Sequence, residues 1–536
     1  MTSNTFILKE DIVFEPLVNN WYAHSFLISP ATLAMVMRDK IRLMKSFLAS
    51  PELHEMATKD SEVVGRTFLN VPASKSALVE KLLDETIKKN EDRTRFAESV
   101  TDLQNLLLKD AKGFSLENLY KKVPEPLRGL VELYYDVNNQ PGFRFFEALL
   151  YKYPKYNTND QSIFLYRMDP DIRGNIVDTP RIPDESAFEF KVPFCDPVID
   201  KIAKFRSEPA TYNEIVGNLP DSFKPRFTDF FTESSDLPEN NHNYSGDEIR
   251  IRYFGHACVL LQTNEISILI DPFINYSESQ SNQNFSFEDL PTVINYVLIT
   301  HNHGDHIIPE YLLQLRYKIE HIVVPKNGNG NLEDPSLKLM LESIGFKDVL
   351  TLDELQSISI PSGEIIGLPF LGEHCDLNIH SKILHFVKLK GKSILLASDS
   401  SNLEIEVYHM LKNIIGGVDV LFLGMESEGA PLSLNYAPFM TKELNTKMDQ
   451  SRRVNGSNFE SGMAIVTEFN AKEVYIYAMG IEPWTRYILG IKYTEESIQL
   501  KEADKLITKC NSLGIHSELL ANKRELFLKS ELTVKG

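Results

Sequence analysis

The chain has 536 residues, 43% of them hydrophobic and 24% charged, which is typical of a globular protein with about two to four domains. Its formal net charge of −19 disfavours nucleic acid as a partner, because phosphate binding requires clustered Lys and Arg side chains. No apolar run approaches the roughly 18 residues of a membrane helix, and no signal peptide is visible at the start, so we expect no membrane association.

Residues 1–232 are predicted to form an N-terminal α+β domain. Leu, Met, Ile and Phe recur with helical spacing through residues 30–49, and a Ser-Pro pair at the start favours a helix N-terminus. The charged segment 75–110 has the same spacing, and residues 116–152 are interpreted as further helices interrupted by prolines. A strand is predicted at residues 162–168. No motif in this domain indicates chemistry.

Residues 233–248 are predicted to link two domains. They are polar, with proline, glycine and several asparagines, and such a segment cannot bury apolar surface. After them the pattern changes, because short strands and helices alternate with short connections from residue 249 onward. This alternation predicts an α/β domain over residues 249–536, with helices packed outside stacked sheets.

A dense group of potential metal ligands follows one predicted strand of this second domain. Residues 296–300 are apolar or β-branched, a pattern that predicts a buried strand. Four potential ligands come directly after it: His301, His303, Asp305 and His306. Imidazole and carboxylate are usual ligands of divalent transition metals, and Gly304 allows a sharp turn between the two pairs. The motif therefore predicts two adjacent metal ions, although a histidine-rich surface loop is the alternative.

Two further carboxylates follow predicted strands in the same way. Asp399 comes after residues 393–398 and could bridge two metal ions with its two oxygens, or alternatively cap a helix N-terminus. Glu373 comes after residues 366–371 and opens the sequence Glu-His-Cys-Asp. From the residues alone, Glu373 and its neighbour His374 are equal candidates for one ligand position.

The sequence HNHGDH at residues 301–306 resembles the HxHxDH signature of the metallo-β-lactamase superfamily. The turn at residues 255–257, the strand end at 270–272 and Asp399 fall where that superfamily has its landmarks. The resemblance covers about residues 247–536. It implies an α/β fold, an αββα sandwich, with the metal site at strand ends between the two sheets.

The sequence departs from the hydrolases of that superfamily at two ligands. They usually carry a histidine between the motif and the bridging aspartate, where this chain offers Glu373. Their final histidine is also missing, and Glu482 is a candidate to replace it. The expected ligands are three imidazoles and three carboxylates: His301, His303, Asp305, His306, Glu373 and Asp399. Because dioxygen-activating diiron proteins use carboxylate-rich ligand sets, we expect two iron ions instead of two zinc ions.

The whole chain resembles the diiron β-hydroxylases of nonribosomal peptide pathways, which pair an N-terminal α+β region of similar length with a metallo-β-lactamase-like domain. The resemblance implies a monooxygenase that uses O2 and external electrons to hydroxylate Cβ of an amino acid. That amino acid would be held as a thioester on a peptidyl carrier domain of a nonribosomal peptide synthetase, as in antibiotic biosynthesis. A homodimer is also implied, with the N-terminal region supporting dimerisation and partner docking, while the electron donor is not identified.

The resemblance also implies which residues would hold each of the two irons. His301, His303 and Glu373 would hold one iron, Asp305 and His306 the other, and Asp399 would bridge both.

Other residues near the predicted site have open roles. Glu426 follows a strand and is either an acid that steers a ligand or a proton, or a solvated loop residue. Residues 429–462 form a long insertion, which is interpreted as a lid over the substrate, or alternatively as a peripheral addition. Arg452 and Arg453 within it could contact the phosphate of a phosphopantetheine arm or carboxylates of the carrier.

The four cysteines are scattered without a CxxC pair, which is typical of free thiols in a reducing cytoplasm. We therefore expect a cytoplasmic protein. Two alternative functions remain at this point. The first is a dinuclear zinc hydrolase of the same fold, cleaving an ester, lactone or phosphodiester with metal-bound hydroxide. The second is a partner-binding module with a vestigial metal site.

Overall fold

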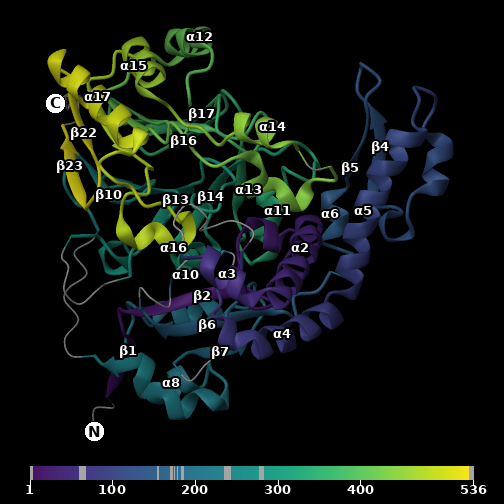
Figure 1. The fold of residues 1–536 in the computed structure, drawn as a ribbon. Helices are drawn as coiled ribbons and strands as arrows, with labels where there is room; N and C mark the ends of the chain where they lie inside the picture. Colours follow the sequence, from purple (N-terminus) through teal and green to yellow (C-terminus); the bar gives the residue numbers. More distant parts are fainter. Residues whose placement is uncertain are drawn as a thin grey trace.

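The computed structural model describes residues 4–59, 68–153, 156–169, 173, 176–177, 179–182, 186–234, 243–276, 283–442 and 444–529. Two stacked sheets make up the C-terminal half, and the N-terminal half lies against one of them (Figure 1). Among the described residues, no helix combines the length and the apolar character needed to cross a bilayer. The segment 235–242, half of the predicted linker, lies outside the described residues.

The first C-terminal sheet has the strand order β15-β14-β13-β12-β11-β10-β23. In chain order its strands are β10 Ile249–Gly255, β11 Cys258–Gln262, β12 Ser267–Ile270, β13 Ile294–Leu298, β14 Ile319–Pro325, β15 Val349–Leu352 and β23 Arg524–Leu528. Strands β12 to β15 are parallel to one another, whereas β10 and β11 pair antiparallel. The carboxyl ends of β12 and β13 therefore meet at one edge, where α/β sheets commonly carry their sites.

The second sheet has the order β16-β17-β18-β19-β20-β21-β22. Its strands are β16 Ser357–Ile360, β17 Gly363–Leu368, β18 Leu384–Leu389, β19 Lys392–Leu396, β20 Val420–Gly424, β21 Glu473–Tyr477 and β22 His516–Leu519. Alternate apolar side chains of both sheets, such as Ile268 and Leu298 on one side and Ile394 and Phe422 on the other, form one buried cluster. This cluster is the layer between the two sheets.

Helices cover the outer faces of both sheets. The helices α12 Ile405–Ile415, α15 Phe459–Glu468 and α17 Ile498–Ser512 pack on the second sheet, while α10 Pro309–Leu315 and α11 Leu337–Ser343 pack on the first. Three shorter helices complete this half: α13 Leu432–Tyr436, α14 Thr446–Ser451 and α16 Arg486–Leu489. The architecture is an αββα sandwich, so the predicted fold class is confirmed.

The N-terminal half combines small sheets with helices. Its strands are β1 Thr5–Leu8, β2 Ile12–Val18, β3 Trp21–Tyr22, β4 Val131–Tyr135, β5 Pro141–Phe145, β6 Gln161–Arg167, β7 Phe188–Lys191, β8 Ala210–Thr211 and β9 Phe231–Glu233. Its helices are α1 Ser25–Ile28, α2 Pro30–Ala49, α3 Pro51–Ala57, α4 Ser76–Lys89, α5 Glu91–Asp110, α6 Glu147–Leu150, α7 Val198–Lys204, α8 Tyr212–Val216 and α9 Phe227–Phe230. Helices α4 and α5 and the β4–β5 hairpin lie on the side of the molecule away from α17 (Figure 1).

Of the helix predictions for the N-terminal half, the first is confirmed, the second is confirmed in part and the third is wrong. The helix predicted at residues 30–49 is α2. The helical segment 75–110 is two helices, α4 and α5, which meet at the buried Asn90. The prediction of helices throughout residues 116–152 was wrong, because β4 and β5 form an antiparallel hairpin there. The prolines in that segment separate short elements, and the alternating pattern of β4 packs one face against the core.

Buried charged and phenolic side chains join the two halves, and we call them the interdomain cluster: Glu15, Tyr22, Tyr166, Arg173, Arg181, Tyr276 and Glu310. Glu310, on α10, accepts hydrogen bonds from Tyr22 at 2.8 Å and Tyr276 at 2.6 Å, and forms an ion pair with Arg173. Glu15, on β2, pairs with Arg181 at 2.5 Å. The helix that follows the predicted metal ligands is thus fixed to the N-terminal half.

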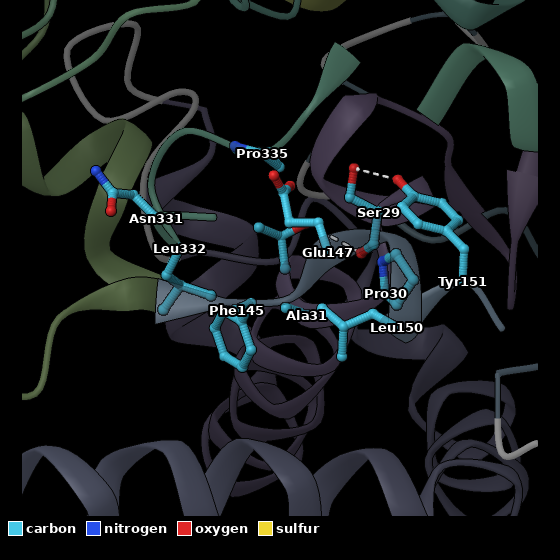
Figure 2. A pocket seen from close by; sticks show the side chains of 11 residues that line it. Ser29, Pro30, Ala31, Phe145, Glu147, Leu150, Tyr151, Asn331, Leu332 and Pro335 are labelled. Atoms are coloured by element: carbon cyan, nitrogen blue, oxygen red, sulfur yellow. Dashed lines mark hydrogen bonds between the residues drawn. The ribbon is translucent and has the colours of Figure 1, made fainter. Parts of the chain in front are cut away.

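A narrow pocket also lies between the halves (Figure 2). Residues 29–32 and 145–151 of the N-terminal half face residues 331–335 of the C-terminal half across it. The carboxylate of Glu147 crosses the boundary and accepts a hydrogen bond from the backbone N–H of Ser336 at 2.7 Å. Only about 10 Å³ is left for the centre of a water molecule, so the pocket has room for one water and not for a substrate.

Candidate metal centre

The histidine-rich motif lies between β13 and α10, at the carboxyl end of the strand. Strand β13 ends at Leu298, two residues earlier than predicted, and Thr300 turns its hydroxyl to neighbouring polar side chains instead of continuing the ladder. The backbone N–H of His306 donates to the carbonyl of His303 at 3.1 Å, which closes the turn. A Cβ on Gly304 would meet nothing within 4 Å, so the motif is open on this side.

One group of potential ligands contains His301, His303 and Glu373. Nε2 of His301 lies 3.1 Å from Nδ1 of His303, and Nδ1 of His303 lies 2.9 Å from Oε1 of Glu373. All three side chains are almost fully buried. Glu373 follows β17 and reaches this position through a left-handed backbone conformation with φ of 68°.

A second group contains His256, Asp305 and His306, and a third joins His301 and His306 to Asp399. Oδ2 of Asp399 lies 2.8 Å from Nε2 of His306 and 3.7 Å from Nε2 of His301. Asp399 follows β19, so the second sheet supplies this carboxylate while the first sheet supplies the imidazoles. Asp399 thus faces ligands of both groups, as a bridging carboxylate must.

The donor set suits two metal ions. Two donors that are each about 2.1 Å from one ion, at right angles to each other, lie about 3.0 Å apart, close to the separations found here. Among the described residues, Oδ1 of Asp399 is buried without a hydrogen-bond partner. Buried polar atoms are normally paired, so this oxygen indicates that a ligand completes the site.

The histidine pKa values show how charge is arranged in the metal-free site. Burial lowers the pKa of His306, but the carboxylates Asp399 and Asp305 outweigh burial and hold it well above the usual value. Burial lowers the pKa of His301, and the neighbouring imidazoles lower it further. Burial also raises the pKa of Glu373. Metal cations bound among these groups would supply the positive charge that the buried carboxylates need.

Asp271 lies behind the potential ligands and holds the ring of one of them, His306. It follows β12 and accepts hydrogen bonds from the backbone N–H of Thr300 at 2.8 Å and from its hydroxyl at 2.6 Å. Its Oδ2 also lies 2.9 Å from Nδ1 of His306, which leaves Nε2 of that ring free to face the ligand group. Carboxylates in this position fix the tautomer and orientation of metal-bound histidines. The sequence marked Asp271 only as the end of a strand.

Glu373 and His374 take different positions. Glu373 belongs to a ligand group, whereas His374 belongs to none among the described residues. The His374 ring stacks on His303, with centroids 4.4 Å apart, and its two nitrogens are buried without partners in the described part of the chain. The geometry therefore favours Glu373 between these two candidates.

Glu426 and Glu482 lie beside the ligands without joining them. Burial, followed by the nearby carboxylates Glu373 and Asp399, raises the pKa of Glu426 well above its usual range. Oε1 of Glu482 accepts a hydrogen bond from Tyr253 and, at 3.1 Å, from the backbone N–H of His256. In the described ranges, Glu482 is in no ligand group.

The insertion at residues 429–462 contains α13, α14 and the start of α15, and part of it reaches the site. The hydroxyl of Tyr436 lies 3.5 Å from Nε2 of His303. Nε of Arg452 donates to the carbonyl of Cys375 at 2.9 Å, and Arg453 donates to Gln450 at 2.7 Å. The insertion therefore packs against the loop that carries Glu373.

Comparisons with known proteins cover the whole chain. Residues 7–234 match the family model described as the diiron non-heme β-hydroxylase N-terminal domain, and residues 250–377 match a β-lactamase superfamily domain. The 4-amino-L-phenylalanyl-[CmlP-peptidyl-carrier-protein] 3-hydroxylase of Streptomyces venezuelae is 33% identical over 533 residues, which cover 97% of this chain and 99% of the relative.

The crystal structure of CmlA, a diiron β-hydroxylase from Streptomyces venezuelae, superimposes with a TM-score of 0.91. It is 32% identical and covers 98% of this chain and 100% of its own. Similarity to hydrolases is much shorter, since a metal-dependent hydrolase of Rhizobium johnstonii is 37% identical over only 59 residues. That match covers 11% of this chain and 24% of the relative.

Proposed function

Because the chain belongs to the family of diiron non-haem β-hydroxylases, we propose that it hydroxylates Cβ of an amino acid tethered as a thioester to a peptidyl carrier domain. The predicted family, enzyme class and two-iron cofactor are confirmed by these similarities. The tethered substrate is inferred from the Streptomyces relative, whose name specifies a peptidyl carrier protein. The observation that carries the proposal is the buried cluster in which imidazoles and carboxylates from both sheets converge, with Oδ1 of Asp399 left unpartnered among the described residues.

The geometry of this cluster supports the following distribution of the ligands. His301, His303 and Glu373 would hold one iron, and Asp305 and His306 would hold the other, with Asp399 between them. When bound by these residues, the two irons would supply the activation of O2 and the cleavage of the substrate C–H bond. External electrons must reach them from a reductant that the chain itself does not identify.

The protein groups around the ligands have separate tasks in this proposal. Glu426 would hold a proton beside the ligand carboxylates and give it up or recover it during turnover, because burial disfavours its charged form. Asp271 keeps the His306 ring in one orientation. Tyr436 and the insertion around it close the site on the His303 side, which would exclude water from the reacting centre.

The tethered substrate must enter from outside the cluster. The open side of Gly304 is one point of access to the motif. We assign the insertion at residues 429–462 to the walls of this entrance, with Arg452 and Arg453 available to the phosphate of the phosphopantetheine arm or to carboxylates of the carrier. Arg452 already holds the carbonyl of Cys375 in the loop of Glu373, and Arg453 holds Gln450 of the insertion, so their contact with a carrier would be made from a fixed position.

We also propose that the N-terminal region, residues 1–232, supports a homodimer and the docking of the carrier. Several large apolar side chains are exposed there, including Phe114 at 82% and Val137 at 98%. Exposed apolar groups of this kind are common at protein interfaces. With a net charge of −19, docking of an acidic carrier would depend on local apolar contacts.

Mass spectrometry tests the proposal directly. Candidate aminoacyl carrier domains are incubated with the iron-loaded protein, a chemical reductant and O2. The mass of the intact aminoacyl carrier is then measured. The proposal predicts that one carrier gains a single oxygen atom on Cβ of its amino acid. Release of the amino acid without O2 uptake would instead establish the hydrolase alternative.

A further inference from the structure

We propose that Trp484 is a redox-active residue, which gives electrons to the iron centre through a row of packed rings when O2 is activated and no substrate is bound. The row runs from His256, beside the predicted ligands, through Phe273 to Trp484. The electrons protect the side chains of the site from oxidation in such a cycle. The inference rests on the two-iron part of the proposed function and not on the tethered substrate.

The rings of this row are in contact from the metal centre outward. Nε2 of His256 lies 3.0 Å from Oδ2 of Asp305, one of the predicted ligands. The centroid of the His256 ring lies 5.6 Å from that of Phe273, and the Phe273 centroid lies 5.0 Å from that of Trp484. Aromatic side chains that pack together have centroids about 4.5–7 Å apart. Because electrons tunnel quickly across such short gaps, the row connects the site to Trp484 electronically.

Trp484 is the outer end of the row. Its side chain is partly exposed, whereas His256 and Phe273 are almost fully buried. The indole lies directly on the turn that precedes His256, because a Cβ on Gly255 would collide with its ring. The glycine thus allows the close approach of the indole to the backbone. Trp484 therefore contacts both the buried turn and the solvent.

A second branch also leaves Phe273, but it is less suited to oxidation. Phe273 packs against Tyr311 and Tyr487, with centroids 5.5 and 5.9 Å away. A phenol releases its proton when it loses an electron, yet these two hydroxyls bond to each other at 2.5 Å and to no carboxylate or imidazole in the described ranges. The guanidinium of Arg173 also lies 3.6 Å from the Tyr487 centroid, and its positive charge opposes the removal of an electron.

An indole differs from a phenol because it can lose an electron and keep its proton. Nε1 of Trp484 is buried without a hydrogen-bond partner in the described part of the chain, so no base is placed to take that proton. The oxidised form of Trp484 is therefore an indole radical cation. The second branch lacks this option, which favours Trp484 as the residue that is oxidised.

The other tryptophan of the chain has different surroundings. Trp21 is fully buried in the N-terminal half, and the ammonium of Lys40 lies 4.7 Å from its ring centroid. This positive charge opposes oxidation of Trp21. Among the residues that the structure describes, no cation lies over the Trp484 ring. The two tryptophans thus form a matched pair, in which only one is suited to oxidation.

The electron balance shows when Trp484 is needed. Reduction of O2 to two water molecules consumes four electrons and four protons. In hydroxylation, two electrons come from the external reductant through the irons, and two come from the substrate C–H bond. Without substrate, the irons still give two electrons, and the missing two must come from the protein. Trp484 gives one, the external reductant returns one electron to the indole radical cation, and Trp484 then gives the second, while water supplies the protons.

Electron paramagnetic resonance of freeze-quenched samples tests the inference. The reduced, iron-loaded protein is mixed with O2 without substrate, and ring-deuterated tryptophan identifies an indole radical by the narrowing of its spectrum. Since the chain has two tryptophans, Trp21→Phe leaves Trp484 as the single indole, and Trp484→Phe leaves Trp21. Phenylalanine keeps an aromatic ring at either position but resists oxidation. Circular dichroism and iron content establish that each variant is folded and loaded.

We expect the indole radical in the parent and in Trp21→Phe, and its loss in Trp484→Phe. After repeated cycles with O2, peptide mass spectrometry should find added oxygen mainly on Trp484 in the first two proteins. In Trp484→Phe, the added oxygen should appear instead on His256 and other side chains of the site, and iron should be lost in fewer cycles.

The inference is overturned if Trp21→Phe shows no indole radical, a result that does not depend on the folding of the Trp484 variant. It is also overturned if the radical and the pattern of oxidation are unchanged in Trp484→Phe. A protein that takes up O2 but does not hydroxylate a carrier-bound amino acid would remove the proposed function and leave the role of Trp484 intact. Absence of O2 uptake by the reduced iron protein would overturn both.

Discussion

The metal centre and the interdomain cluster are both buried and polar, and they meet at α10, but their polar atoms are satisfied in opposite ways. In the interdomain cluster, Glu310 has Arg173, Tyr22 and Tyr276 as partners, and Glu15 has Arg181. In the metal centre, carboxylates and imidazoles face each other, and buried atoms lack partners among the described residues. The polar groups of the interdomain cluster satisfy one another, whereas those of the metal centre require bound cations.

The difference separates stability from function. A buried charge is tolerated when it is paired and hydrogen-bonded, so removing one member of the interdomain cluster leaves an uncompensated charge. Removing Glu373 from the metal centre, whose pKa is raised by burial, relieves desolvation in the metal-free protein, while it weakens the binding of iron. Substitutions in the two clusters should therefore have effects of opposite kind.

The largest effect is expected from Asp399→Asn in the metal centre. An amide cannot replace the charge of a carboxylate that faces both ligand groups, so hydroxylation should fall by well over about 100-fold. Product analysis measures the change. Retention of a tenth of the activity would contradict the assignment of Asp399.

Glu310→Ala should have the opposite signature. The substitution leaves the buried Arg173 without its carboxylate, which should lower the free energy of unfolding by about 3–5 kcal/mol. Urea unfolding of the metal-free protein measures the change. The control is Glu406→Ala, because Glu406 is exposed. Its replacement should change the free energy of unfolding by less than about 0.5 kcal/mol. A loss as small as that of the control would show that the pair at Glu310 is not structural.

Asp271→Asn tests the support of the metal centre. Since Asp271 orients the His306 ring, its loss should weaken iron binding by about 10- to 100-fold. Competition with a chelator of known affinity measures the change. Asp419→Asn is the control, because Asp419 bonds to Ser393 at the opposite end of β19 and should leave iron affinity unchanged. Equal affinities for the two variants would argue against the orienting role.

The smallest effect is expected at His24, a histidine of the N-terminal half. Burial, and then the charge of Lys40, lower the pKa of His24 from 6.5 to about 3. Below pH 6.5 the unfolded chain therefore binds a proton at His24 that the folded protein does not bind. The free energy of unfolding thus decreases as the pH is lowered, by up to about 2 kcal/mol at pH 5. His24→Phe should remove this part of the fall, measured as the difference between parent and variant unfolding at pH 7 and pH 5. Parallel pH profiles would contradict the shifted pKa.

The fold could be predicted where local pattern and tertiary packing agree. The helix at residues 30–49 has regular apolar spacing and a start signal, and the structure keeps those bounds. The β4–β5 hairpin was missed because its prolines suggested broken helices, whereas its register depends on pairing between Val131 and Phe145, which no local signal specifies.

The candidate site shows the same limit. His301, His303, Asp305 and His306 are adjacent in sequence, so their grouping was visible, and Glu373 and Asp399 followed clear strands. Asp271 and His256 come from distant strands and become neighbours of these ligands only in the folded sandwich. The positive φ of His256 is a backbone conformation that the neighbouring sequence does not predict.

Anomalous X-ray diffraction from crystals of the iron-loaded protein tests the central claim most directly, because it locates each metal and identifies it by its absorption edge. We predict two iron peaks, one among His301, His303 and Glu373 and one beside Asp305 and His306, with Asp399 between them. A single peak, or two peaks at the zinc edge in protein prepared with both metals available, would contradict it.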